Sequence, residues 1–416
     1  MTHRNRRTFL TTVATAGTIG LAGCLSSVRE WRSDGGSPSR EKSDDDGDDA
    51  LGLLGEPIDD FEVLDGWTAM IDAGSLEADA DDPYAGSQSA RLTADEDTEY
   101  AAIYRTIPDG LDLRERSLSL AVAFTGREQL HLSLELFAPD SRAVHTMERT
   151  LVGPTDRWTR VDFGTTRVDG QPDLSDVREI RLTARRRGTG DGSIDCRFDD
   201  LRAVDRPDSG SVMLLFDGSL ESHYEIAFER MEEYGYTGVE SVIYEALGDG
   251  GRLTIDELHE LDDAGWDVAA RPRTGSQSLP DMSPDEQAEA IERTNAFLES
   301  RGFEDGATHF VTPRNVLGPE TIDLVREHYE TAFRFGGAPN ARPLTDPHNV
   351  GFFSGTDGET TKQYVDYAAE YGELAVLHVE HVGDDGFSEA AFVDLLAHID
   401  ATDVDVVTAT DILEGR

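Results

Sequence analysis

Lysine is almost absent from this chain of 416 residues. Only Lys42 and Lys362 are present, and lysine and arginine together number 37 against 84 acidic residues, for a formal net charge of -47. No basic face is therefore available to neutralise nucleic-acid phosphates. Carboxylates repel one another in dilute buffer, whereas molar salt shortens the screening length to about 3 Å. We expect a halophilic protein of haloarchaeal origin and no nucleic-acid partner.

Cysteine and long apolar runs are also scarce. The apolar run of residues 11–23 is too short and too weakly hydrophobic to span a bilayer comfortably. It follows "RNRRTFL" (4–10), a twin-arginine export pattern, and ends at "LAGC" (21–24), which resembles a lipobox. We predict export and a lipid on Cys24 that anchors the protein to the outer face of the cell membrane. A cleaved signal peptide with an incidental cysteine is the alternative. Lipidation of Cys24 would leave only Cys196, and so no intrachain disulfide.

Composition divides the chain into four segments. Residues 1–23 form the predicted twin-arginine signal peptide, and residues 24–55, rich in Ser, Asp and Gly, form an acidic disordered tether. Residues 56–206 contain short runs in which apolar and polar residues alternate, which is the period of half-buried strands. These runs are residues 89–94, 100–107, 117–125, 130–138, 158–164 and 178–186. We expect an all-β sandwich in this segment.

Strand-like and helix-like segments alternate from residue 211 to residue 416. We expect a helix at 221–234, the last strand at 404–410 and a loop at 346–353. The capping boxes "TIDE" (254–257) and "SPDE" (283–286) begin two of the helices. This regular alternation, with about seven repeats, predicts a parallel sheet closed into an α/β barrel. Active sites of such barrels lie at the carboxyl ends of the strands, so the residues that end each strand are the candidates for function.

The segment 211–416 resembles the polysaccharide deacetylase family, the NodB-homology fold. The resemblance rests on "LLFDG" (214–218), "LDDAGWDVAAR" (261–271), "VTPRNVLGPETIDLVREHY" (311–329) and "AVLHVEH" (375–381). It implies a distorted (β/α)7 barrel that hydrolyses the carbon–nitrogen bond of N-acetylated sugars. It also implies a divalent metal, held by one aspartate and two histidines, that activates water.

Matched residue by residue, the resemblance places Asp217 as the catalytic base and His378 as the general acid. The positions of the three metal ligands are occupied instead by Gly218, Arg271 and Gly275. None of these side chains is a metal donor, and the guanidinium would repel the ion. We therefore expect lost or altered metal-dependent activity and no cofactor, so whether the chain is an enzyme stays open.

Two further interpretations of the strand ends stay open. A relocated zinc site could form from Asp217, His378, Glu380 and His381. Alternatively, Arg271 and Arg314, with a further arginine at residue 273, could bind the carboxylate of an acidic sugar bidentately. Salt bridges with the chain's own carboxylates are the simpler use of these arginines. The alternative function is a non-catalytic cell-surface protein that binds a glycan or serves as a scaffold.

The segment 56–206 resembles the jelly-roll, galactose-binding-like modules attached to sugar-active enzymes. The resemblance rests on "PYAGSQSARL" (83–92), "LSDVREIRL" (174–182) and "SIDCRFDDLRAV" (193–204). It implies that aromatic side chains could stack on sugar rings, although strand aromatics more often pack in cores; the candidates are Trp67, Tyr84, Tyr104 and Trp158. For Asp199 and Asp200 we expect solvated acids, with a structural calcium site as the alternative.

Overall fold

The computed structural model describes the chain from residue 53 to residue 415, with gaps at 127–128, 188–191, 356–357 and 384–385. The predicted signal peptide, the lipid anchor on Cys24 and nearly all of the tether lie outside the described residues. The chain from Gly47 to Arg416 forms one compact unit. No helix in the described ranges is long and apolar enough to cross a membrane.

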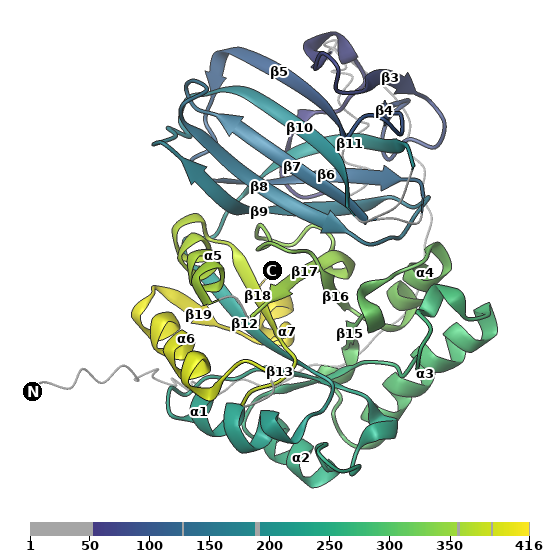
Figure 1. Ribbon diagram of the computed structural model, residues 1–416, viewed down its shortest axis with the longest axis vertical. Helices are drawn as coiled ribbons and strands as arrows, with labels where there is room; N and C mark the ends of the chain where they lie inside the picture. Colours follow the sequence, from purple (N-terminus) through teal and green to yellow (C-terminus); the bar gives the residue numbers. More distant parts are fainter. Residues whose placement is uncertain (1–52, 127–128, 188–191, 356–357, 384–385, 416) are drawn as a thin grey trace, which may run out of the picture. The chain divides into compact units, whose positions relative to one another are not determined.

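The N-terminal part of this unit is an antiparallel β-sandwich (Figure 1), as the alternating pattern predicts. Its strands are β1 (Glu56–Asp59), β2 (Trp67–Ala69), β3 (Ser75–Asp79), β4 (Ser89–Ala94), β5 (Tyr100–Leu111), β6 (Arg116–Phe124), β7 (Gln129–Phe137), β8 (Val144–Leu151), β9 (Thr159–Asp169), β10 (Val177–Arg187) and β11 (Ile194–Asp205). Their order is β2-β5-β10-β7-β8-β9-β6-β11-β4-β3, with β1 on β11.

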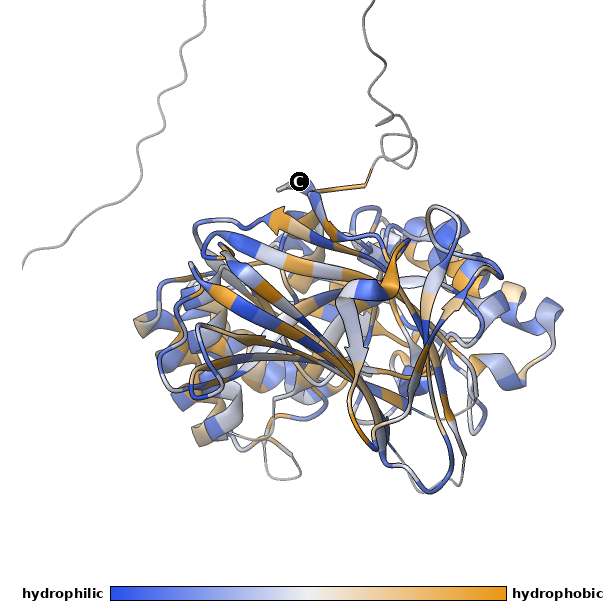
Figure 2. Cartoon of the chain, turned by 90° about the horizontal axis from the view of Figure 1, so that it is seen from above, coloured by the Kyte–Doolittle hydropathy of each residue, from blue (hydrophilic) through white to orange (hydrophobic). Residues whose placement is uncertain are grey.

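The long strand β9 joins the two sheets of the sandwich. Its first half, residues 159–163, pairs with β6, and its second half, residues 164–169, pairs with β8. Apolar side chains from both sheets fill the space between them, among them Leu120, Leu134 and Phe163. Apolar and polar residues alternate along these strands, as Figure 2 shows by the change of colour from residue to residue.

The C-terminal part is a parallel barrel surrounded by helices, which confirms the predicted α/β architecture. Its strands are β12 (Gly210–Asp217), β13 (Val239–Val242), β14 (Asp267–Ala270), β15 (His309–Val311), β16 (Thr331–Phe335), β17 (Val350–Ser354) and β18 (Leu374–Val379). Each strand pairs in parallel with the next, and β12 pairs with both β13 and β18, so the sheet closes on itself. A further strand, β19 (Val404–Val406), pairs with the start of β12.

The membership of the barrel differs from the prediction in one strand. The sequence pattern takes residues 404–410 as the last barrel strand and leaves residues 346–353 as a loop. In the structure β19 has only three residues and pairs with β12 alone, whereas Val350–Ser354 forms β17 between β16 and β18. The turn residues "DPHN" directly before β17 conceal this short strand.

Helices connect the barrel strands. They are α1 (Glu229–Glu232), α2 (Ile255–Asp263), α3 (Pro284–Ser300), α4 (Pro319–His328), α5 (Gly358–Tyr371), α6 (Glu389–Ala401) and α7 (Ala409–Glu414). Both predicted capping boxes are present, at Thr254 before α2 and at Ser283 before α3. The expected helix at 221–234 is a π-helical segment, His223–Phe228, that continues into the short α1.

Buried polar contacts join the sandwich to the barrel. Arg149 of β8 is 1 % exposed and donates hydrogen bonds to Asn340 Oδ1, at 2.7 Å, and to the backbone oxygen of Asn349. The Glu373 carboxylate accepts hydrogen bonds from the backbone nitrogen and the hydroxyl of Thr165, at 2.9 and 2.6 Å. Because buried polar groups of each domain have hydrogen-bond partners in the other, the two domains hold each other in place.

Candidate functional site

Four polar side chains meet where barrel strands β12, β13, β14 and β18 end. Asp217 is the last residue of β12 and lies in register with Ser241 of β13, whose hydroxyl donates to Asp217 Oδ1 at 2.7 Å. His378 Nε2, from β18, lies 3.1 Å from Asp217 Oδ2. Arg271, directly after β14, places Nε 2.5 Å from Asp217 Oδ1 as an ion pair. The structure therefore brings three of the predicted site residues together on one carboxylate.

The electrostatics of this cluster keep Asp217 ionised. Burial raises the pKa of the Asp217 carboxyl, but the hydrogen bond from His378, the Arg271 guanidinium and the Ser241 hydroxyl outweigh burial and lower it to about 2. A carboxylate this stable as an anion is a weak base near neutral pH. It can still orient His378, because Nε2 of the imidazole is held by Asp217 Oδ2.

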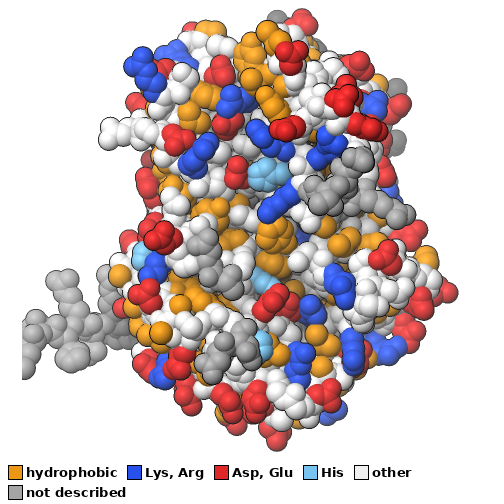
Figure 3. Space-filling model, in the orientation of Figure 1, with side chains coloured by type: hydrophobic (Ala, Val, Ile, Leu, Met, Phe, Trp, Pro, Cys, Tyr) orange, Lys and Arg blue, Asp and Glu red, His pale blue; other side chains and the backbone are white. Residues whose placement is uncertain are grey.

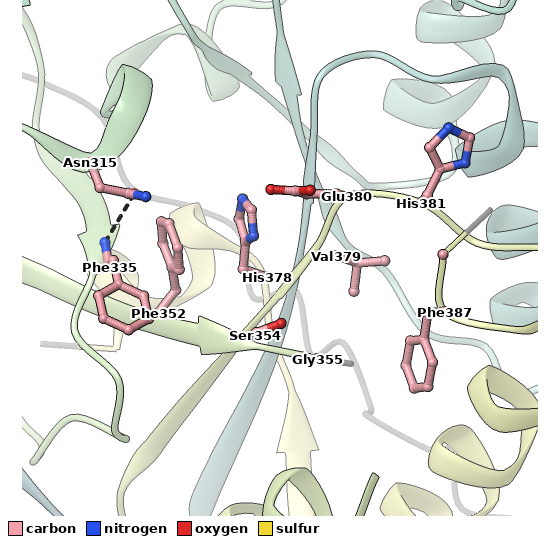
Figure 4. A pocket seen from close by; sticks show the side chains of 11 residues that line it. Asn315, Phe335, Phe352, Ser354, Gly355, His378, Val379, Glu380, His381 and Phe387 are labelled. Carbon is pink, nitrogen blue, oxygen red and sulfur yellow. Dashed lines mark hydrogen bonds between the residues drawn. The ribbon is translucent and has the colours of Figure 1, made fainter. Parts of the chain in front are cut away.

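A cavity of about 460 Å³ lies beside His378 (Figure 4). The His378 ring stacks on Phe352 of β17, with ring centroids 4.2 Å apart and planes 9° from parallel. No hydrogen-bond partner of His378 Nδ1 is found among the described residues. Three phenylalanines and several polar groups line this volume: Asn315, Phe335, Phe352, Ser354, Gly355, His378, Val379, Glu380, His381, Gly386 and Phe387. The cavity offers both apolar rings and hydrogen-bonding groups to a ligand.

A buried histidine–glutamate pair lies next to the polar cluster around Asp217. Glu240 of β13 accepts a hydrogen bond from the backbone nitrogen of Ser219 at 2.9 Å, and its other oxygen lies 2.8 Å from His223 Nδ1. His223 Nε2 lies 2.8 Å from the backbone oxygen of Glu380. Burial lowers the pKa of His223, but the facing Glu240 carboxylate outweighs it, so the pKa is raised. The pair ties the turn after β12 to the segment after β18.

Sequence reasoning did not identify this pair. Its one signal is Glu240, an acid within the otherwise apolar run "GVESVI" (238–243) of a predicted barrel strand. Both side chains are completely buried, and buried charges are usually paired. Ser241 was missed as well, since the register that sets it against Asp217 is a property of the folded sheet.

The two arginines predicted to bind substrate occupy different surroundings. Arg271 is engaged with Asp217. Arg314 is exposed, and its Nη2 donates to the backbone oxygen of Gly275 at 2.7 Å. Neither arginine lines the cavity beside His378. The structure therefore shows Arg271 in the salt bridge that was the simpler interpretation, while substrate binding by either arginine stays a prediction.

The residues at the position where the sequence resemblance implies a metal do not fit one. Gly218 has no side chain to donate, and Arg271 brings a cation to Asp217. The backbone at Gly218 has φ +106°, and a Cβ there would lie 3.3 Å from Arg252 Nη1, so an aspartate would be strained. Among the described residues no group of three His, Cys, Asp or Glu side chains is placed to hold a metal.

The relocated zinc site predicted from Asp217, His378, Glu380 and His381 is not assembled either. His381 Nδ1 lies 3.4 Å from the Ser222 hydroxyl. Figure 4 shows the Glu380 carboxylate on the His378 side of the cavity and the His381 ring on the other side. The side chains of His378, Glu380 and His381 line one cavity. Within the described part of the chain, they and Asp217 form no group that is placed to hold a metal.

The candidate residues of the sandwich separate into core and surface groups. Trp67 is 5 % exposed and stacks on Phe61 in the core. Tyr104 is partly exposed in β5. Tyr84 and Trp158 are also partly exposed and contact each other edge to face, with ring centroids 5.8 Å apart. The ring contact between Tyr84 and Trp158 thus lies at the edge of the sandwich that faces the barrel.

The expectation that Asp199 and Asp200 are solvated is wrong. Their exposed fractions are 0 % and 2 %. Asp199 accepts hydrogen bonds from the backbone nitrogens of residues 84, 85 and 200, and Asp200 forms ion pairs with Arg160, at 2.6 Å, and Arg202, at 2.8 Å. These donors satisfy the two carboxylates without a calcium ion. We expected exposed carboxylates because acidic residues are abundant in this chain, but the folded sheet buries both of them.

Comparisons with known proteins give structural matches only. No family model and no curated protein matches the chain. The Xyl-CE4 domain of a multidomain xylanase from the hindgut metagenome of Trinervitermes trinervoides is 16 % identical, with 50 % of this chain and 91 % of that chain covered and a TM-score of 0.36. A family 4 acetyl xylan esterase from Clostridium thermocellum in complex with a cobalt ion is 15 % identical over 49 % of this chain and 90 % of that one, with a TM-score of 0.36.

The sandwich has structural neighbours of its own. A family 11 carbohydrate-binding module from Clostridium thermocellum, in complex with a β-1,3-1,4-mixed-linked tetrasaccharide, is 14 % identical. The alignment covers 37 % of this chain and 96 % of that one, with a TM-score of 0.28. Similarities this low carry no information about activity.

Proposed function

We propose that this protein binds glycans and that its barrel no longer performs the metal-dependent deacetylation that the sequence resemblance implies. One observation carries the proposal: the Arg271 guanidinium forms an ion pair with Asp217 at the place where the resemblance puts a metal ligand. A fixed cation of this kind neutralises the carboxylate permanently. It supplies no open coordination position at which water could be activated.

The cavity beside His378 is the proposed glycan site of the barrel. Sugar rings present apolar C–H faces and hydroxyl groups, and the cavity has phenylalanine rings next to amide, carboxylate and imidazole groups. Its volume of about 460 Å³ lies within the range of small-molecule sites, roughly 300–1,000 Å³. Aromatic surface supplies most of the buried area in such a site, and the polar groups fix the orientation of the ligand.

Isothermal titration of the full chain with tetra-N-acetylchitotetraose, in molar KCl containing EDTA, tests the proposal. We expect saturable binding that Phe335→Ala weakens by about tenfold, since Phe335 is a partly exposed ring of the cavity wall. Phe297→Ala is the matched control, because Phe297 is a partly exposed ring of α3 outside the cavity. Binding that requires added zinc, or that both variants leave unchanged, would contradict the proposal.

Metal-independent hydrolysis is the second candidate function. It is favoured by one observation: Asp217 holds His378 Nε2, and among the residues that the structure describes none is hydrogen-bonded to His378 Nδ1 beside the cavity. An imidazole oriented in this way can exchange a proton with a bound ligand. Release of acetate from acetylated chitin and xylan fragments, abolished by His378→Ala and insensitive to EDTA, would establish this function; no release above the rate of the variant would exclude it.

The location of the protein follows from residues 4–24 alone. We propose that the twin-arginine signal exports the folded chain and that a lipid on Cys24 anchors it at the outer face of a haloarchaeal cell membrane. Because one lipid chain binds a bilayer weakly, stable anchoring would need a second chain or a partner. Mass spectrometry of the N-terminal peptide after expression in a haloarchaeal host tests this proposal, and an unmodified Cys24 would contradict it.

A further inference from the structure

A second cavity, of about 610 Å³, lies where the sandwich meets the barrel. Its sandwich wall comes from the loop before β4, with Tyr84, and from the segment before and at the start of β9, with Trp158. Its barrel wall comes from Arg326 of α4 and from Thr345 and Asp346. It shares no lining residue with the cavity beside His378. Figure 3 shows that the face it draws carries many acidic side chains with arginine or lysine side chains among them.

Two aromatic rings form the apolar part of this junction cavity. The planes of Tyr84 and Trp158 are 62° apart, so the rings form an angled wall. Trp158 is held by a hydrogen bond from Nε1 to the backbone oxygen of Asp82, at 2.8 Å, and Arg197 lies over its ring at 5.2 Å. Both aromatic side chains are partly exposed. Such rings can take the C–H face of a ligand without rearrangement, which lowers the entropic cost of binding.

The loop that carries Tyr84 is itself fixed. Asp199 is fully buried and accepts the backbone hydrogen bond of Tyr84 at 2.9 Å. Arg160 lies under the Tyr84 ring, with its Cζ 5.5 Å from the centroid, and forms a buried ion pair with Asp200. The carboxylates that the sequence placed in solvent therefore hold the wall of this cavity in position.

The polar rim of the junction cavity contains both signs of charge. Asp82 and Asp156 are exposed and line the cavity, so their carboxylates can accept hydrogen bonds from a ligand. Arg157 and Arg326 are the hydrogen-bond donors of the rim, and each already forms an ion pair with an acidic residue. Arg157 pairs with Asp323, and Nη2 of Arg326 lies 3.2 Å from Asp346 Oδ2. Neutral sugar hydroxyls can both donate to the carboxylates and accept from the guanidiniums. A uronic acid would instead meet two exposed carboxylates and arginines that are already paired.

We infer that the junction cavity binds one ring of a neutral glycan, stacked on Trp158 and hydrogen-bonded to the mixed rim. The site is separate from the barrel cavity and does not depend on the proposed function of that cavity. Because its walls come from both domains, it also gives the tight sandwich–barrel junction a role in recognition. A long polysaccharide could then contact the protein at two places, one at the strand ends of the barrel and one at the junction.

Trp158 provides a direct optical readout. The other tryptophans that the structure describes, Trp67 and Trp266, are 5 % and 2 % exposed in the two cores. The probes are cellotetraose, xylotetraose and tetra-N-acetylchitotetraose, with tetragalacturonate as the acidic comparison, titrated into the full chain in molar KCl. We expect a saturable fluorescence change with at least one neutral probe and a weaker response to tetragalacturonate. No response to any neutral probe, or tighter binding of tetragalacturonate, would overturn the inference.

Variants then locate the binding. Trp158→Ala should weaken the affinity measured by calorimetry by about tenfold, because it removes the stacking surface. Asp156→Asn removes one carboxylate from an exposed residue at φ 57°, a conformation that asparagine tolerates, so the fold is kept and a several-fold loss is expected. Phe297→Ala, whose ring lies on α3 outside both cavities, should leave this affinity unchanged. Loss of binding in Phe335→Ala with full affinity in Trp158→Ala would overturn the junction site while leaving the barrel site supported.

Discussion

Replacing Arg271 by methionine should destabilise the barrel through the carboxylate that it leaves behind. The Asp217 and Arg271 side chains are 12 % and 21 % exposed, with Nε and Oδ1 2.5 Å apart. The partners of Asp217 lower its pKa from 3.8 to about 2 against the opposing effect of burial. A depression of this size corresponds to about 2 kcal/mol of stability at neutral pH. Breaking a fully buried ion pair costs about 3–5 kcal/mol, and because His378 and Ser241 remain, we expect about 2 kcal/mol for Arg271→Met.

The sign of the pH dependence follows from the same pKa. Because the folded-state pKa of Asp217 lies below its unfolded value of 3.8, the stabilisation is present above about pH 4 and is lost as pH falls toward 2. Arg271→Met raises the folded-state pKa and should reduce this acid-dependent loss. Asp217→Asn should abolish the part of the acid-dependent loss of stability that comes from residue 217, because the amide does not titrate.

Urea unfolding in molar KCl is the assay, since salt screens the acidic surface but acts little on a buried pair. The double variant Asp217→Asn/Arg271→Met removes both charges and should be more stable than Arg271→Met alone. The cycle of single and double variants measures the coupling directly. Wild-type stability in Arg271→Met, or costs that simply add in the double variant, would refute the interpretation of this pair as a buried, mutually dependent ion pair.

Three further changes test other parts of the structure. Burial raises the pKa of Glu373 to about 8 from an ordinary 4.5. Because the folded state then holds this proton more tightly than the unfolded state does, the melting temperature should fall as pH rises from 4.5 toward 8. Glu373→Gln should reduce this pH dependence. Gly218→Ala should cost about 1–2 kcal/mol in chemical unfolding, because φ is +106° and Arg252 lies 3.3 Å from the new Cβ. His223→Ala should cost about 3 kcal/mol by leaving Glu240 buried and unpaired, and His223→Ala/Glu240→Gln should recover part of it; no recovery would contradict the pairing.

Alternation of apolar and polar residues identifies a strand that has one apolar face and one solvent face. β4, with residues 89–94, alternates as the period of two requires and was predicted with its observed bounds. β8 was missed because its polar residues, such as His145 and Arg149, are buried against the barrel instead of facing water. The pattern method assumes that polar means exposed, and this assumption fails at a polar domain junction.

The candidate site was predictable where topology alone decides position. The carboxyl ends of parallel strands meet at one end of a barrel, so Asp217, Arg271 and His378 were expected near one another. Their mutual contacts depend on register and on side-chain direction, which is why Ser241 was not identified. The burial of Asp200 likewise depends on a local irregularity, since the register of β11 against β6 shifts between residues 199 and 202.

The most direct test of the account is the metal content of the purified full chain. Elemental analysis after equilibration with zinc in molar KCl, followed by removal of free ion, gives the stoichiometry. We predict no stoichiometric zinc, because Gly218, Arg271 and Gly275 supply no donors and Arg271 neutralises Asp217. One zinc ion per chain, lost in His378→Ala, would show that the strand ends hold a metal after all and would contradict the account.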